Sequence, residues 1–100
     1  MTYVSQKTRG RFVRNLLPSP VEYYAKQGIK LKGSGQWKQT LCPFHKDTNP
    51  SMSINLFKGA FRCMACVAKG GDIVSFHQQL HRMNFIQTCK QLGAWVEDNS

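Results

Sequence analysis

Two short stretches, Cys-Pro-Phe-His at 42–45 and Cys-Met-Ala-Cys at 63–66, decide the fold of this 100-residue chain. Each places two soft ligands three residues apart, and 17 residues separate the two pairs. Zinc takes nitrogen and sulfur ligands at the corners of a tetrahedron, and paired ligands on neighbouring hairpin loops supply that geometry. The spacing therefore predicts one structural Zn²⁺ ion, held by Cys42, His45, Cys63 and Cys66.

The cysteines favour a metal over the alternative, which is two disulfides in a secreted protein. There is no apolar signal region near Met1 and no apolar run long enough to span a membrane. Paired spacing without a signal peptide is typical of a reducing compartment, where thiols bind metal. Cys89 is left as a single thiol on an apolar helical stripe, so we expect a small buried side chain there.

The charge of +9 is placed unevenly along the chain. Residues 1–32 hold seven Lys/Arg against one acid, residues 33–66 hold four against one, and residues 67–100 hold three against three. Such a distribution indicates a surface that attracts a polyanion, and nucleic acid is the first candidate. The alternative is that the basic balance only aids solubility.

The basic arm at 1–17 shows no clear strand alternation. Arms of this composition are usually loosely ordered and either clamp phosphates or remain solvated. Phe12, Leu16 and Leu17 can form a short helical turn that docks on the domain.

Short strands surround the predicted zinc site. Ser19-Pro20 marks the start of a helix that ends near Gly28, with Val21, Tyr24 and Ala25 as its buried stripe. Alternation and turn residues then predict strands over 29–32, 36–41, 51–56 and 60–63.

Two helices are expected after the second ligand pair. Asp72 can cap a helix that runs to about Arg82, and Asn84 can cap a last helix that ends at Gly93. Phe85, Cys89 and Leu92 form the predicted buried face of that last helix, with Trp95 packed behind it. The fold class is therefore α+β: a small zinc ribbon with a four- to five-stranded antiparallel sheet and flanking helices.

The period of two along the strands predicts a polar face on the sheet. With the apolar strand residues inward, the outward set is Lys30, Lys32, Lys38, Thr40, Ser51, Ser53, Asn55 and Arg62. Basic, hydroxyl and amide groups suit the backbone and base edges of a single strand. The alternative is an ordinary solvated face.

Stacking aromatics are scarce on this predicted face. Strict alternation turns Trp37 inward, and only a shift of register by a bulge would turn it out. Phe57 and Phe44 are the nearest other candidates. The predicted nucleic-acid-binding residues are therefore Lys30, Lys32, Lys38, Ser53, Asn55, Phe57, Lys58 and Arg62.

The sequence shows no catalytic constellation. Its five acids are scattered, it has no phosphate-cradling loop, and a zinc ion with four protein ligands has no open position for water. We therefore expect no catalytic residue, no small-molecule substrate and no enzyme activity from this chain alone. His77 and His81 have metal-compatible spacing, but no glutamate follows His77, so packing or exposure is the expectation.

The stretch from Tyr24 to Trp95 resembles the N-terminal zinc-binding domain of bacterial and phage DnaG-type primases. The matching motifs are the two ligand pairs, IKLKGSGQWKQTL at 29–41, Asn-Pro-Ser at 49–51, Gly-Gly-Asp-Ile at 70–73 and MNFIQTCKQLGAW at 83–95. The chain departs from the family at Val67-Ala68-Lys69, which is bulkier than the Gly-rich stretch usual after the second ligand pair.

The resemblance implies a module that binds single-stranded template DNA in replication, while a separate toprim-type domain or subunit synthesises the primer. It implies a toprim, polymerase or helicase protein as partner, and a cytoplasmic protein encoded by a bacterium, phage or plasmid. The expected division is a basic arm at 1–18, a primase-type zinc-binding domain at 19–96 and a tail at 97–100.

The alternative function is a free-standing interaction protein of a mobile element. It would dock on a primase, polymerase or helicase and modulate it in trans, through the arm and the helices after residue 72.

Overall fold

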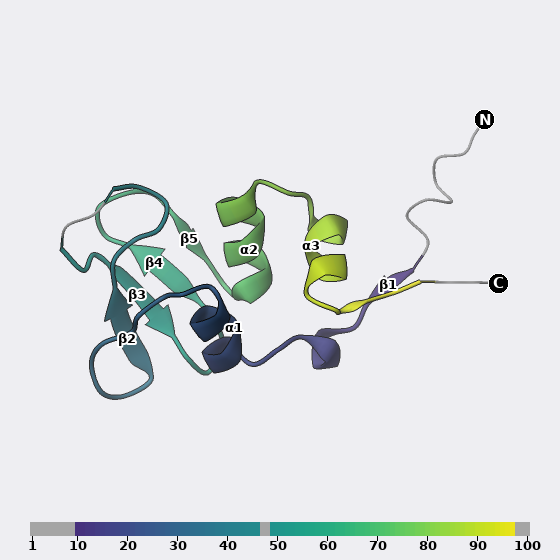
Figure 1. Ribbon diagram of the computed structural model, residues 1–100, viewed down its shortest axis with the longest axis horizontal. Helices are drawn as coiled ribbons and strands as arrows, with labels where there is room; N and C mark the ends of the chain where they lie inside the picture. Colours follow the sequence, from purple (N-terminus) through teal and green to yellow (C-terminus); the bar gives the residue numbers. More distant parts are fainter. Residues whose placement is uncertain (1–9, 47–48, 98–100) are drawn as a thin grey trace.

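A four-stranded antiparallel sheet occupies one end of the molecule, and two helices lie at the other (Figure 1). The computed structural model describes residues 10–46 and 49–97. The strand order follows the chain, as a meander of β2 (Trp37–Thr40), β3 (Met52–Asn55), β4 (Phe61–Cys63) and β5 (Lys69–Gly70). This confirms the predicted α+β class and the antiparallel sheet.

An aromatic cluster joins the sheet to the helices. Phe76 of α2 (Ile73–His81) is fully buried, and its ring centroid lies 4.9 Å from Tyr24, 5.3 Å from Phe44 and 5.0 Å from Phe61. Tyr24 comes from α1 (Pro20–Lys26) and Phe61 from β4, so three elements meet at one side chain. Edge-to-face ring pairs of this kind add stability beyond the area they bury.

The helices begin at the predicted capping residues. Ser19 Oγ accepts a hydrogen bond from Glu22 N at 3.2 Å, and Asp72 Oδ1 accepts one from Ser75 N at 2.9 Å. Asn84 forms a capping box at the start of α3 (Phe85–Gln91). Each side-chain oxygen satisfies a backbone N–H that has no partner within the helix.

The described part of the arm is more ordered than its sequence predicts. β1 (Arg11–Phe12) pairs antiparallel with β6 (Trp95–Val96), and a 3₁₀ turn at Arg14–Leu16 follows. The helical-turn prediction for Leu16 is confirmed, but a two-residue strand is too short to show alternation in the sequence. Residues 1–9 of the arm and 98–100 of the tail lie outside the described residues, and the boundary at 18/19 stays a prediction.

The predicted strand at 29–32 is wrong. Among these residues only Lys32 pairs with the sheet, through a single bridge to Gln39. Ile29 N instead donates to Tyr24 O at 3.1 Å, which ties the start of the segment to the end of α1.

The predicted buried stripe of α1 is also out of phase. Tyr23 and Tyr24 are buried, whereas Val21 is 55% exposed and Ala25 is exposed. The buried and half-buried positions are 20, 23, 24 and 27, which is the ordinary helical spacing shifted by one residue. Two adjacent tyrosine rings bury more contact area than Val21 and Ala25 would, which accounts for the observed orientation of the helix.

The phase of β2 differs from the prediction as well. Its register places Lys38 opposite buried Ile54, and Thr40 opposite buried Met52. Because directly opposed side chains share a face, Lys38 and Thr40 lie on the inner side, and Trp37 and Leu41 are turned outward. Two further residues differ in exposure: Asn55 shares the outer face with Trp37 but is buried, and Phe85 of α3 is 41% exposed.

Candidate functional site

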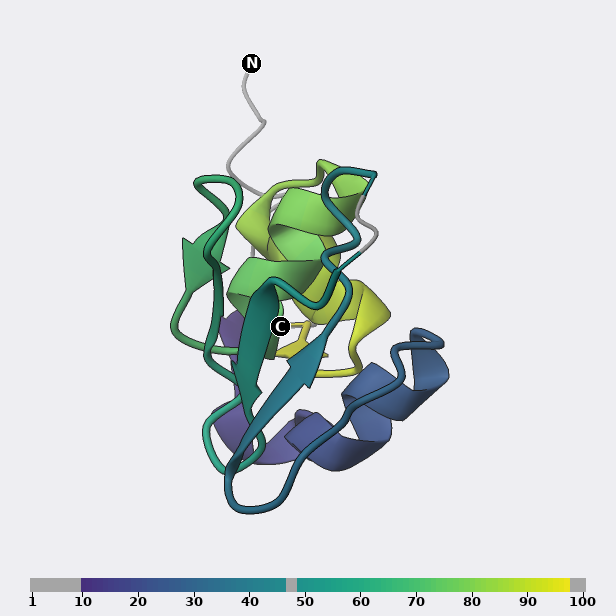
Figure 2. The same ribbon diagram turned by 90° about the vertical axis from the view of Figure 1, so that its left-hand side faces the viewer.

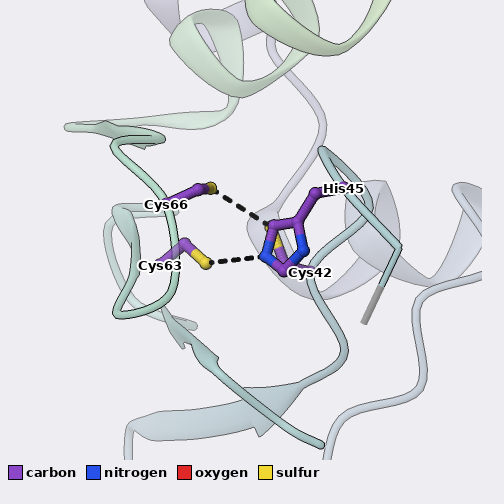
Figure 3. A group of neighbouring side chains, drawn as sticks. All are labelled: Cys42, His45, Cys63 and Cys66. Atoms are coloured by element: carbon purple, nitrogen blue, oxygen red, sulfur yellow. Dashed lines mark hydrogen bonds between the residues drawn. The ribbon is translucent and has the colours of Figure 1, made fainter. Parts of the chain in front are cut away.

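The four predicted zinc ligands converge at one end of the sheet. Cys42 and His45 lie in the loop after β2, Cys63 ends β4, and Cys66 lies in the turn before β5. Figure 3 shows the imidazole of His45 and the three sulfur atoms directed at a common centre. Their ligand atoms all lie within 4.8 Å of one another.

The distances fit a tetrahedral ion. Cys42 Sγ and Cys66 Sγ are 3.8 Å apart, and Cys63 Sγ lies 3.5 Å from His45 Nε2. Sulfur ligands at about 2.3 Å from zinc stand about 3.8 Å apart at the corners of a tetrahedron. The donor set and its spacing therefore fit one Zn²⁺ ion with all four positions filled by protein.

Neighbouring backbone groups orient two of the ligands. His45 Nδ1 lies 3.0 Å from the Lys46 carbonyl oxygen, which can only accept, so Nδ1 carries the proton and Nε2 is the nitrogen that can ligate. Ala65 N donates to Cys63 Sγ at 3.4 Å, and the Ser51 hydroxyl lies 3.5 Å from the same sulfur.

These contacts separate the acidities of two thiols. Burial opposes ionisation of Cys63, but the Ser51 hydroxyl, His45 and the Ala65 N–H together outweigh it and lower its pKa to about 6. Burial raises the pKa of Cys42 to about 12. The Cys63 thiolate is thus the form best prepared for the metal, because zinc binds the thiolate and not the thiol.

Comparison with known proteins bears on this site directly. The family model of the CHC2 zinc finger, of the DnaG zinc-ribbon type, matches residues 20–99. The chain belongs to the DnaG-type CHC2 zinc-finger family. The family is a zinc finger, and the Cys42, His45, Cys63 and Cys66 group is able to hold one metal ion, which confirms the predicted cofactor.

Curated relatives of this CHC2 domain include DNA primases. One from Mycoplasma pneumoniae is 43% identical over 65 residues, which cover 65% of this chain and 10% of that primase. One from Borreliella burgdorferi is 39% identical over 76 residues, which cover 72% of this chain and 14% of that primase. The chain therefore matches only a small part of each relative.

A solved structure shows the same fold. The zinc-binding and RNA polymerase domains of the Aquifex aeolicus primase match with a TM-score of 0.66 and 24% identity. The match covers 80% of this chain and 20% of that one.

The outer face of the CHC2 sheet carries a row of polar side chains. Gln39, Ser53, Arg62 and Lys69 are opposed in turn across the four strands, and the bridge to Gln39 adds Lys32 at the edge. We call these five residues the basic row. Ser53 is half-buried and the other four are exposed. Figure 2 shows the sheet in front of α2 and α3, and α2 packs against its other side through Phe76, whose ring contacts Phe61 of β4.

Several predicted nucleic-acid residues lie elsewhere. Lys38 donates from Nζ to the Gly33 carbonyl oxygen at 2.6 Å. Asn55 Oδ1 accepts from the backbone N–H groups of Phe57 and Lys58, at 2.8 and 3.0 Å, so Asn55 shapes the turn that exposes those two residues. Lys30 is exposed on the segment after α1.

Three features of this face were not predicted from the sequence: Gln39, Lys69 and the outward orientation of Trp37. The position of Lys69 could have been predicted from the second ligand pair. Cys63 and Cys66 lie in a hairpin turn, and pairing of the residues on either side of that turn places Lys69 opposite Arg62. Trp37 is 49% exposed and needs no bulge to face outward. Phe44 is not available for stacking, since its ring stacks on Phe61 at 5.9 Å in the core.

The remaining candidate side chains have structural surroundings. His77 is buried between Tyr23 OH at 2.7 Å and Gln91 Oε1 at 2.8 Å, and Cys89 is fully buried, as predicted. Among the described residues, the zinc ligands are the one group of three or more His, Cys, Asp or Glu side chains that is placed to hold a metal. No helix in the described ranges has the length and apolar character to cross a membrane.

Proposed function

We propose that this CHC2 domain is a zinc-stabilised single-stranded DNA-binding module of a priming system. The observation that supports it is the basic row, because three of its five side chains are cationic and lie on one exposed face. Across four strand spacings of about 4.8 Å the row is about 19 Å long. That is the length of about five to six stacked nucleotides at roughly 3.4 Å each.

The face offers the two interactions that single strands use. Lys32, Arg62 and Lys69 supply charge for phosphates, and Gln39 and Ser53 supply hydrogen-bonding groups between them. Trp37 lies beside the row on β2 and provides an aromatic surface on which a base can stack. Such stacking contributes about 1–3 kcal/mol per base in other single-strand binders.

The salt dependence of binding tests this function. Arg62→Ala and Lys69→Ala should each reduce the slope of log affinity against log salt concentration by about 0.7, the value expected for one lost phosphate contact on a single strand. Lys90→Ala on α3 removes the same charge from a residue paired with Glu97, and should leave the slope unchanged. Fluorescence anisotropy with a labelled oligonucleotide measures all three.

Two results would contradict the proposal. One is equal or tighter binding to a duplex of the same length. The other is an equal effect of the Lys90 variant and the two variants in the basic row.

We further propose that primer synthesis belongs to a separate toprim-type domain or subunit. The matched part of this chain covers only 10% and 14% of two DNA primases, and the zinc site has no open ligand position. Zinc-loaded chain, template and labelled nucleoside triphosphates should therefore yield no primer. Primer formation by this chain alone would overturn that assignment.

Docking on a replication protein in trans remains the second candidate, and the structure limits which surface it can use. Residues 11–12 of the arm are paired with β6, and Arg14 is bonded to Asp72 at 3.2 Å, so this part of the arm is already engaged. The exposed sheet face is the surface assigned above to DNA, and the helices after residue 72 are the other surface expected to dock.

A further inference from the structure

Two large apolar side chains are exposed beside the basic row, on its zinc side. Met64 is 73% exposed and Val67 is 95% exposed. Met64 follows Arg62 by two residues and Val67 precedes Lys69 by two, so both lie in the turn between β4 and β5, next to the paired residues Arg62 and Lys69. The informative observation is that these two exposed apolar side chains lie in one turn, beside two cations, and not singly on the surface.

The four side chains line one hollow. It has a volume of about 270 Å³ and is bounded by Arg62, Lys69, Met64, Val67 and the turn that carries Cys63 and Cys66. Small-molecule pockets usually measure about 300–1,000 Å³, so this hollow suits one flat group rather than a whole nucleotide. Its lining combines two cations with two large apolar side chains.

We propose that one base of the bound single strand occupies this hollow, against Met64 and Val67, while its phosphates follow the basic row. This inference rests on the proposed function and assigns a base-contacting site within it. Arg62 and Lys69 bind the phosphates of the DNA backbone. The base attached to that backbone extends toward the zinc site, and its planar face packs against the two apolar side chains. Methionine adapts its shape to different planar surfaces, so the contact tolerates different bases.

The charges favour a nucleic acid over an apolar protein segment. Within the described residues, neither Arg62 nor Lys69 takes part in an ion pair. Both cations stand at the rim of the hollow, so a neutral apolar occupant would leave them without a counter-charge. A nucleotide supplies an anion and a planar apolar face together, which matches both kinds of side chain in the hollow.

The site also explains a role for the metal beyond folding. Cys63 and Cys66 carry the turn that projects Met64 and Val67, and the ion fixes both sulfur atoms to Cys42 and His45. The position of the base-contacting side chains therefore depends on the zinc ligands. Trp37 and the hollow lie at opposite ends of the basic row, so the row has a base contact at each end.

An oligonucleotide without bases distinguishes contacts to the bases from contacts to the phosphates. The zinc-loaded full chain is titrated with oligothymidylate and with an abasic oligonucleotide that has the same number of phosphates. The double variant Met64→Ser, Val67→Ser should bind oligothymidylate about five- to tenfold more weakly, because it loses apolar area buried on the base. Its affinity for the abasic oligonucleotide should equal that of the unmodified chain.

Val21→Ser is the matched control, because it removes the same exposed side chain from α1, away from the sheet. It should change neither affinity. Normal binding of oligothymidylate by the double variant would overturn this proposal and would leave the apolar pair to a protein partner. An equal loss of affinity for both oligonucleotides would overturn it as well. Absence of binding by the unmodified chain to either oligonucleotide would instead refute the proposed function.

Discussion

Asn55 shows how a single polar residue can be structural in a surface that looks functional. Its side chain is 3% exposed, and its Oδ1 accepts two backbone N–H groups at the turn between β3 and β4. Side chains of this type often satisfy the backbone two or three residues ahead of them. The amide that seemed available for base edges is therefore used to present Phe57 and Lys58.

Replacement of Asn55 by alanine should lower the free energy of unfolding by about 1–2 kcal/mol, because two turn N–H groups lose their acceptor. Urea denaturation of the zinc-loaded protein measures this change. Gln39→Ala, at an exposed position on the same sheet, should stay within about 0.5 kcal/mol of the unmodified chain. Equal stability of the two variants would contradict the structural role of Asn55.

His77 has a hydrogen-bond arrangement that fixes its tautomer. Gln91 Oε1 can only accept, so His77 Nε2 carries the proton, and His77 Nδ1 in turn accepts from Tyr23 OH. Nitrogen-15 spectra of the imidazole should show the Nε2–H form. Tyr23→Phe should remove about 1–2 kcal/mol of stability, because a buried acceptor loses its donor. An Nδ1–H tautomer, or a stability unchanged in this variant, would be inconsistent with the arrangement.

At the scale of elements, the ribbon of β1 and β6 closes the domain. Phe12 of β1 packs edge-to-face on Phe85, with the ring centroids 5.3 Å apart. Arg14 forms an ion pair with Asp72, the N-cap of α2. Gly10 enters this ribbon with a φ of 141°, and a Cβ there would lie 2.6 Å from Val96 O and in contact with the Trp95 ring. The close approach therefore requires glycine.

Gly10→Ala should destabilise the ribbon by about 1–3 kcal/mol, through backbone strain and steric overlap. Amide hydrogen exchange should then rise at Val13, whose N–H donates to Ala94 O at 2.8 Å. Gly71→Ala is the control, because nothing lies within 4 Å of a Cβ at that position. Equal exchange at Val13 in both variants would show that the approach of Gly10 to Trp95 is not required.

At the scale of the whole molecule, one ion ties the loop after β2 to the turn before β5. The domain has a small aromatic core, and structural zinc sites in comparable modules contribute about 10–16 kcal/mol of binding free energy. That exceeds the net stability of most small domains, which is about 5–15 kcal/mol. The folded state of this chain should therefore depend on its metal.

Removal of zinc by a strong chelator should abolish the β-sheet signal in circular dichroism. The metal-free protein should then show no cooperative unfolding transition on heating. The protein should contain one zinc ion per chain, and Cys66→Ser should reduce that content. Cys89→Ala is the control, because this buried thiol lies outside the ligand set. A circular-dichroism spectrum unchanged after stoichiometric metal removal would refute the structural role of zinc.

The sequence by itself determined the features that depend on local chemistry. Ligand spacing identified the zinc set, and Ser19, Asp72 and Asn84 identified the helix starts, because a metal knuckle and a cap are each built from a few adjacent residues. The family resemblance rested on the same local motifs, and the match of residues 20–99 bears it out.

Only the tertiary structure decided which way the side chains face. α1 and β2 were each predicted one residue out of phase, because a seven-residue helix and a four-residue strand contain too few apolar positions to fix their orientation alone. Pairing with β3 turned Trp37 outward and Lys38 inward, and pairing with β5 brought Lys69 beside Arg62. Register is a property of two strands together, so neither strand's sequence could specify it.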